Sequence, residues 1–69
     1  MEIMGVNVKV KAGGFDTAQL SEIVSNCALF GEMEEFVVTD IELSHKYAHV
    51  WGSKEGRSIG QRLAISEVL

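Results

Sequence analysis

The chain has 69 residues, of which 46% are apolar and 23% are charged, with no proline and one cysteine. This apolar fraction is too high for a disordered chain, and the length allows one domain, residues 1–69, with a small hydrophobic core. The single cysteine excludes an internal disulfide, and with two histidines it provides too few ligands for a closed zinc site. Because small domains often gain stability by association, we expect a homodimer.

The net charge of −4 is unevenly distributed, since residues 1–42 hold eight of the ten acidic residues. An acidic chain attracts phosphates weakly, so the charge favours a partner protein with a basic surface over nucleic acid. No apolar run has the length of a membrane span, and the first residues lack the basic start and apolar stretch of a signal peptide. We therefore expect a cytoplasmic protein.

Alternating apolar residues predict the first strand. Val6, Val8 and Val10 alternate with polar residues over residues 5–12, a period of two that is typical of a strand with one buried face. The glycine pair at residues 13–14 ends this pattern. The sequence therefore predicts one half-buried strand near the N-terminus.

A helix is predicted over residues 16–29. Asp16 is a good N-cap, and Gln19 stands three residues later, where it would complete a capping box. Apolar residues recur at helical spacing up to Gly31, which lies where a C-terminal cap is expected. Cys27 falls on the apolar stripe, so we expect it in the core.

Two more strands are predicted over residues 36–44 and 47–51. In the first, simple alternation places on one face Val37, Thr39, Ile41 and Leu43, and on the other Val38, Asp40 and Glu42. In the second, the small and branched Ala48 and Val50 suit a face packed on the helix. The opposite face would then carry the aromatic row of Tyr47, His49 and Trp51.

The last third of the chain is less regular. Glycines at three positions weaken any helix there, by up to about 1 kcal/mol each. We predict a short helical segment over residues 54–62 followed by an extended tail. A final strand over residues 61–68 is the alternative.

The order strand, helix, strand, strand corresponds to the front half of a split βαβ unit, so we predict a ferredoxin-like α+β fold. In that fold the first and third strands pair within an antiparallel sheet that has helices on one face. Four segments carry a family resemblance, namely residues 17–24, 30–35, 47–50 and 60–68. They resemble the first helix, the following loop, the third strand and the last strand of an RNA-recognition motif (RRM) domain.

The chain departs from that family at several positions. Lys46 replaces a glycine, His49 replaces the central stacking phenylalanine, and Gly52 replaces the last aromatic residue of the family's pattern. The segment after the third strand is also too short for a full second helix and a strand. A missing element would leave an exposed sheet edge, which a homodimer can cover by joining edges or by exchanging the tail.

The aromatic row is the first candidate site. Tyr47, His49 and Trp51 would line an exposed sheet face, with Lys9 and Lys11 beside them. Such a face suits the stacking of single-stranded RNA or DNA bases. It equally suits a protein interface, in which Trp and Tyr are favoured.

The second candidate site is acidic and consists of Glu32, Glu34, Glu35, Asp40 and Glu42. These carboxylates can dock on a basic surface, with Tyr47 and Trp51 as apolar anchors. If that surface belongs to a nucleic-acid-binding protein, the chain would mimic nucleic acid and inhibit its binding. The primary prediction is therefore a partner-binding protein, and the alternative is a single-stranded nucleic-acid binder.

Catalysis is not expected. The two histidines have no accompanying nucleophile and buried acid, and residues 52–58 lack the Gly-Lys pair of a phosphate-binding loop. No Asp-rich loop with a central glycine suggests a metal ion. We therefore predict no enzyme activity, no cofactor and no metal.

Overall fold

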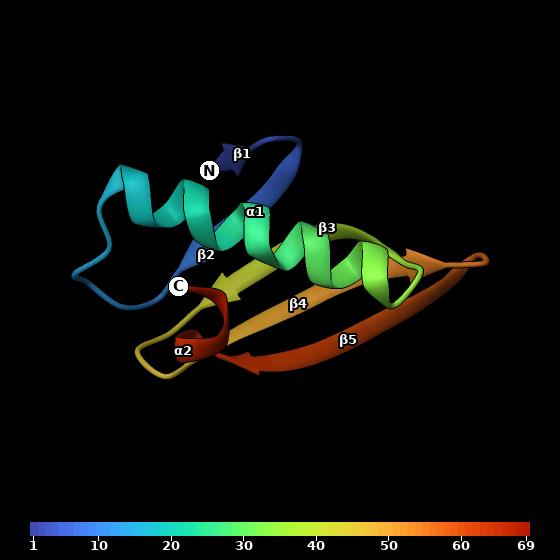
Figure 1. Cartoon of the computed structure of the whole chain (residues 1–69). Helices are drawn as coiled ribbons and strands as arrows, with labels where there is room; N and C mark the ends of the chain where they lie inside the picture. The colour runs from blue at the N-terminus through green and yellow to red at the C-terminus, as the bar shows by residue number, and fades with distance from the viewer.

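The computed structural model describes residues 1–69, which form one mixed five-stranded sheet with two helices (Figure 1). The elements in chain order are β1 (Glu2–Ile3), β2 (Val6–Val10), α1 (Thr17–Met33), β3 (Val37–Leu43), β4 (Tyr47–Lys54), β5 (Arg57–Ala64) and α2 (Ile65–Val68). The strands are ordered β1-β2-β3-β4-β5 across the sheet. The predicted α+β class is confirmed, and the strand count is higher than predicted.

The strand order differs from that of a split βαβ unit. β2 pairs directly with β3 in parallel, and α1 connects them, whereas all the other neighbours are antiparallel. The prediction that the first and third predicted strands pair is therefore wrong, because β4 pairs with β3 and β5 instead. The sheet is mixed, and β1, which the sequence analysis did not predict, forms its short first edge.

The capping box of α1 is present. A side-chain oxygen of Asp16 accepts a hydrogen bond from the Gln19 amide at 2.8 Å, and the Gln19 side chain accepts one from the Asp16 amide at 3.0 Å. The helix continues beyond the predicted residue 29 to Met33, and Gly31 is not its cap. A Cβ at Gly31 would lie 2.7 Å from Val38 Cγ2, so this glycine allows α1 to approach β3 closely.

A β-bulge explains an error in the predicted faces of β3. The pairing with β4 shifts between Val38 and Asp40, which inserts Thr39 as an extra residue. Val38 is therefore buried on the same side as Ile41 and Leu43, whereas Val37 is exposed. Simple alternation had placed Val37 on the face of Ile41 and Leu43, and Val38 on the other face, so both assignments were wrong.

The predicted helix over residues 54–62 is wrong, because this segment is a hairpin of β4 and β5. Glu55 and Gly56 form its two-residue turn, with φ of 51° and 78°, both in the left-handed region. The alternative final strand over residues 61–68 matches only the end of β5, since α2 follows at Ile65. Only glycine fits at position 52, because a Cβ there would overlap the carbonyl oxygen of Val37.

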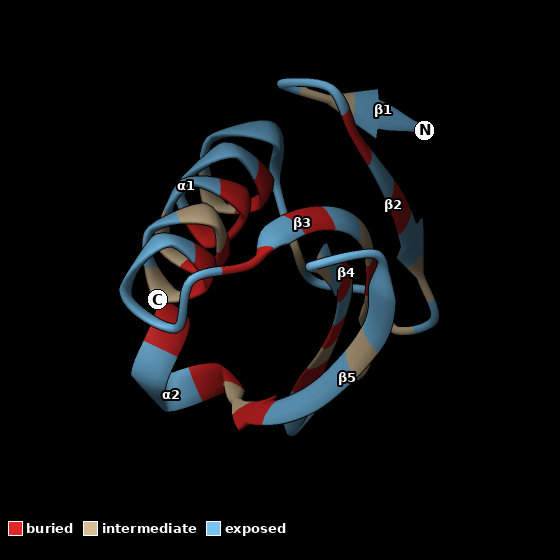
Figure 2. Cartoon of the chain, turned by 90° about the vertical axis from the view of Figure 1, so that its right-hand side faces the viewer, coloured by how far each residue is buried: buried red, intermediate tan, exposed pale blue.

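The core lies between α1, α2 and one face of the sheet (Figure 2). It contains no buried polar or charged side chain, and its members are Val6, Val8, Leu20, Ile23, Val24, Cys27, Phe36, Val38, Ile41, Leu43, Ala48, Val50, Leu63, Ile65 and Val68. The prediction that Cys27 is a core residue is confirmed. Neither helix has the length and the apolar character needed to cross a membrane.

Candidate binding surface

One face of the sheet carries no helix. α2 packs against α1, and the Asn26 side chain donates a hydrogen bond to the Val68 carbonyl at 2.7 Å, so both helices lie on the same side (Figures 1 and 2). The other side, which we call the open face, is lined by Asn7, Lys9, Asp40, Glu42, Tyr47, His49, Trp51 and Arg62. The register places Trp51 between Asp40 and Gly60, and His49 between Glu42 and Arg62.

The predicted aromatic row is on this face. Ala48 and Val50 are fully buried, whereas Tyr47 is 42% exposed and Trp51 is 36% exposed. The rings of His49 and Trp51 stack with their centroids 4.0 Å apart and their planes within 10° of parallel. The row is therefore ordered by its own contacts and is accessible from the solvent.

Two residues that the sequence analysis missed complete the row. The Arg62 Cζ lies 4.6 Å from the centroid of the Tyr47 ring, a cation–π contact. A Cβ at Gly60 would come within 3.2 Å of the Trp51 indole, so the indole rests on the bare backbone at that position. Both lie on β5, and the alternation of this strand is obscured by Gly60 itself.

A depression of about 210 Å³ lies on the open face beside Trp51. Trp51 lines it together with Asn7, Lys9, Asp40, Ile41 and Glu42. The Asn7 side-chain amide donates a hydrogen bond to one carboxylate oxygen of Asp40 at 3.2 Å, and the Thr39 hydroxyl donates one to the other oxygen at 2.9 Å. The carboxylate of Asp40 is thus oriented by two neighbours next to an indole.

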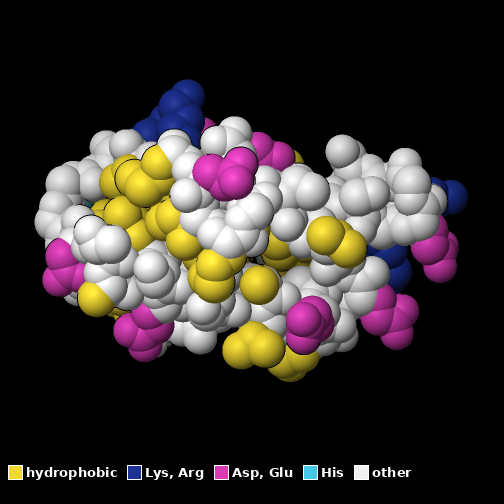
Figure 3. Space-filling model, turned by 90° about the horizontal axis from the view of Figure 1, so that it is seen from above, with side chains coloured by type: hydrophobic (Ala, Val, Ile, Leu, Met, Phe, Trp, Pro, Cys, Tyr) yellow, Lys and Arg dark blue, Asp and Glu magenta, His cyan; other side chains and the backbone are white.

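The five predicted acidic residues do not form one patch. Asp40 and Glu42 lie on the open face, whereas Glu32, Glu34 and Glu35 surround the C-terminal end of α1. Figure 3, which views the molecule from above Figure 1, on the side where α1 lies, shows acidic side chains at separate places between exposed apolar groups. The structure therefore brings together only Asp40, Glu42 and Trp51 of the predicted partner-binding residues in a single depression.

The two predicted lysines differ in their surroundings. Lys11 forms the only ion pair in the structure, with its Nζ 3.2 Å from a carboxylate oxygen of Glu42. Lys9 lines the depression and stands in register with Glu42. The open face therefore carries two cations, Lys9 and Arg62, and the carboxylates of Asp40 and Glu42, and Lys11, which follows β2, adds a third cation beside Glu42.

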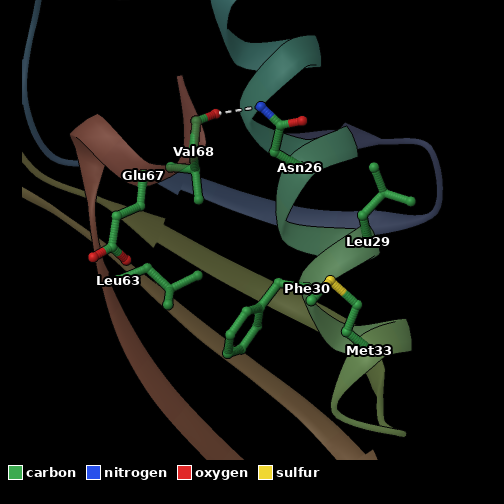
Figure 4. Close-up of a pocket in the computed structure, with 7 residues that line it drawn as sticks. All are labelled: Asn26, Leu29, Phe30, Met33, Leu63, Glu67 and Val68. Atoms are coloured by element: carbon green, nitrogen blue, oxygen red, sulfur yellow. Dashed lines mark hydrogen bonds between the residues drawn. The ribbon is translucent and has the colours of Figure 1, made fainter.

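A second concavity lies on the helix side, between α1, α2 and β5 (Figure 4). It has a volume of about 310 Å³ and is mainly apolar, with Leu29, Phe30, Met33, Leu63 and Val68 among its lining residues. Met33 is 81% exposed and Leu29 is 56% exposed. We call this concavity the helix-side groove.

Cys27 is the one cysteine of the chain, and it is fully buried in the core. Burial raises the pKa of the Cys27 thiol from 9.0 to about 11, so this thiol stays protonated at neutral pH. No group of three or more His, Cys, Asp or Glu side chains is arranged to hold a metal ion. Comparison with known protein families, curated proteins and solved structures finds no match to this chain.

Proposed function

We propose that this chain is a non-catalytic interaction protein that binds the basic surface of a partner protein through its open face. The observation that carries the proposal is the depression in which the Trp51 indole stands beside the carboxylates of Asp40 and Glu42. An arginine side chain of the partner fits this chemistry, because its guanidinium can stack on an indole and donate paired hydrogen bonds to a carboxylate. Tyr47 would add an exposed aromatic anchor beside the depression.

Charge favours a protein partner over nucleic acid at this position. Asp40 lies within the depression and forms no ion pair, so its carboxylate would repel a phosphate placed against Trp51. The charge of Glu42 is offset by its ion pair with Lys11, and Lys9 also lines the depression, so this preference depends on Asp40. The net charge of −4 acts in the same direction at longer range. A partner whose basic surface also binds nucleic acid would be inhibited by this contact, because the two ligands would compete for the same cations.

Binding of single-stranded RNA or DNA is the second candidate, and the aromatic row favours it. Tyr47, His49 and Trp51 are aligned along β4, with Lys9 and Arg62 on either side. Stacking on such rings contributes about 1–3 kcal/mol per base. Under this alternative, Tyr47→Ala would weaken oligonucleotide binding without unfolding the domain.

The two candidates can be separated by fluorescence, because Trp51 is the only tryptophan. We would titrate the protein with a poly-arginine peptide and, separately, with oligouridine and oligothymidine, while recording Trp51 emission. The proposal predicts that the peptide changes the emission. It also predicts that the double variant Asp40→Asn, Glu42→Gln loses about tenfold or more in affinity, as expected for lost charge-assisted hydrogen bonds.

The double variant Glu22→Gln, Glu67→Gln provides a matched control, because it also removes two charges, both from exposed acids on the helices and away from the open face. This variant should bind the peptide nearly as well as the wild type. Equal losses of peptide affinity in the two variants would show that the effect arises from net charge alone, and would contradict the proposal. Oligonucleotide binding that weakens with salt, without peptide binding, would establish the second candidate instead.

A further inference from the structure

The outer edge of β5 is unpaired. β5 spans eight residues, is the last strand of the sheet and pairs only with β4. In an antiparallel ladder, alternate residues direct their N–H and C=O groups away from the partner strand. Since Lys54 and Arg57 close the two-residue turn, the outward groups belong to Ser58, Gly60, Arg62 and Ala64.

This edge has neither the proline nor the bulge by which proteins often prevent strand addition, although β5 carries two arginines, Arg57 and Arg62. The chain has no proline, and the register of β5 with β4 runs without a bulge from Arg57 to Ala64. The side chain of Arg62 leans over the Tyr47 ring on the open face and does not cover the edge. The other end of the sheet differs, since β1 has only two residues there.

The helix-side groove runs beside the same edge. Leu63 of β5 lines it together with Phe30 and the exposed Met33 (Figure 4). Ile59 is only partly buried, although it points to the same side of the sheet as Leu63. Apolar side chains of the helix-side groove therefore lie beside the unpaired edge of β5, where an added strand would contact them.

We propose that β5 pairs antiparallel with β5 of a second copy of this chain, with Gln61 of the two copies opposite each other on the two-fold axis. This register places the partly buried Ile59 opposite Leu63, a core residue of the second copy, so Ile59 of each copy gains an apolar neighbour across the interface. A shift in one direction would place Arg62 opposite itself, where like charges repel. A shift in the other direction would set Ile59 opposite Gln61 and lose both apolar pairs.

The two-fold axis would be perpendicular to the sheet. The dimer would then contain one continuous sheet with five strands from each copy. Both copies of α1 would cover one side, and the two open faces would form a single larger surface on the other. This inference does not depend on what the open face binds, because it concerns the strand edge and the helix-side groove.

A cysteine at the axis provides a direct test. Residues opposite each other at a non-hydrogen-bonded position have Cα atoms about 4.5 Å apart, within the range that a disulfide bridges. Gln61→Cys should therefore form a covalent dimer under mild oxidation. Ser58→Cys is the matched control, because two copies of residue 58 would be about 20 Å apart in this register. The native Cys27 is fully buried and should not contribute.

The mass in solution provides the second readout. Sedimentation equilibrium of the wild type should give twice the chain mass of 7.6 kDa. Ile59→Lys should give a monomer with an unchanged circular dichroism spectrum, since an inward-pointing lysine blocks an edge strand. A monomeric wild type, or crosslinking of Ser58→Cys as efficient as that of Gln61→Cys, would overturn the proposal.

Discussion

The two faces of the sheet carry different kinds of residue on the same strands. In β4, Ala48 and Val50 are fully buried on the helix side, whereas Tyr47 and Trp51 project from the other side and are partly exposed. The buried residues on the helix side are all apolar, and the open face carries rings, cations and carboxylates. Neighbouring residues therefore have separate roles, and substitutions on the two faces should affect different properties.

This separation follows from the geometry of a strand. Successive side chains point to opposite faces, so one strand can supply the core and a binding surface at once. A domain of 69 residues has little surface to spare, and an open sheet face provides a rigid platform without additional loops. The experiments below test whether stability and binding are divided between the faces in this way.

The largest expected effect is on the helix side, at Gly52. A Cβ there would overlap the Val37 carbonyl oxygen and lie 2.5 Å from Phe36 Cδ2, so Gly52→Ala must displace backbone. We expect a loss of about 3 kcal/mol or more in the free energy of unfolding, measured by urea denaturation. Gly13→Ala is the control, since a Cβ at Gly13 meets nothing within 4 Å. Equal stability of the two variants would contradict the packing described here.

Cys27 predicts a pH dependence of stability. Its pKa is raised by burial to about 11 in the folded protein, against 9.0 for the exposed thiol. The contribution to stability is complete below pH 9 and is lost as the pH rises through 11, because only the unfolded chain readily releases this proton. The loss should reach about 2–3 kcal/mol. Cys27→Ala should lack this component, and identical pH profiles of the two proteins would refute it.

Two neighbouring residues of β4 provide the sharpest contrast between the faces. Val50→Ala removes two fully buried methyl groups and should lower the free energy of unfolding by about 2 kcal/mol. Trp51→Ala should cost a similar amount, about 1–2 kcal/mol, because the ring stacks on His49, yet it should also abolish peptide binding. Isothermal titration calorimetry and urea denaturation of both variants would measure the two properties. If Val50→Ala lost peptide binding under conditions in which it is fully folded, stability and binding would not be divided between the two faces.

The smallest effect is expected from the acidic end of α1. Glu34 and Glu35 lie at the turn that follows the helix, outside the depression on the open face. Their charges can act on a basic partner only at long range, so the double variant Glu34→Lys, Glu35→Lys should weaken peptide binding by about two- to fivefold at low salt. The effect should disappear in high salt. Complete loss of binding would instead make this end of the helix the main contact.

Local patterns in the sequence predicted part of this architecture. The capping box at Asp16 and the alternation of β4 involve residues close together in the chain, and both are present. The bulge at Thr39 was not predictable from alternation, because it depends on the pairing of β3 with β4. β5 was predicted only in part, by the alternative strand over residues 61–68, because Gly60 weakens a helix and a strand alike and is explained only by its contact with Trp51.

The candidate site was predicted in part for the same reason. The aromatic row follows from the period of one strand, so its residues were identified correctly as lying on one face. The grouping of Trp51 with Asp40, and the separation of both from Glu34, depend on register and on the path of the chain between α1 and β3. Arg62 reaches Tyr47 only through the pairing of β4 with β5.

Chemical-shift mapping by NMR would test the central claim most directly. Uniformly ¹⁵N-labelled protein would be titrated with the poly-arginine peptide, and the amide shifts would be compared between the two faces. The account predicts the largest changes at Asn7, Asp40 and Trp51, including the indole N–H, with little change along α1. Changes centred on α1 or on the helix-side groove, with the open face unaffected, would contradict it.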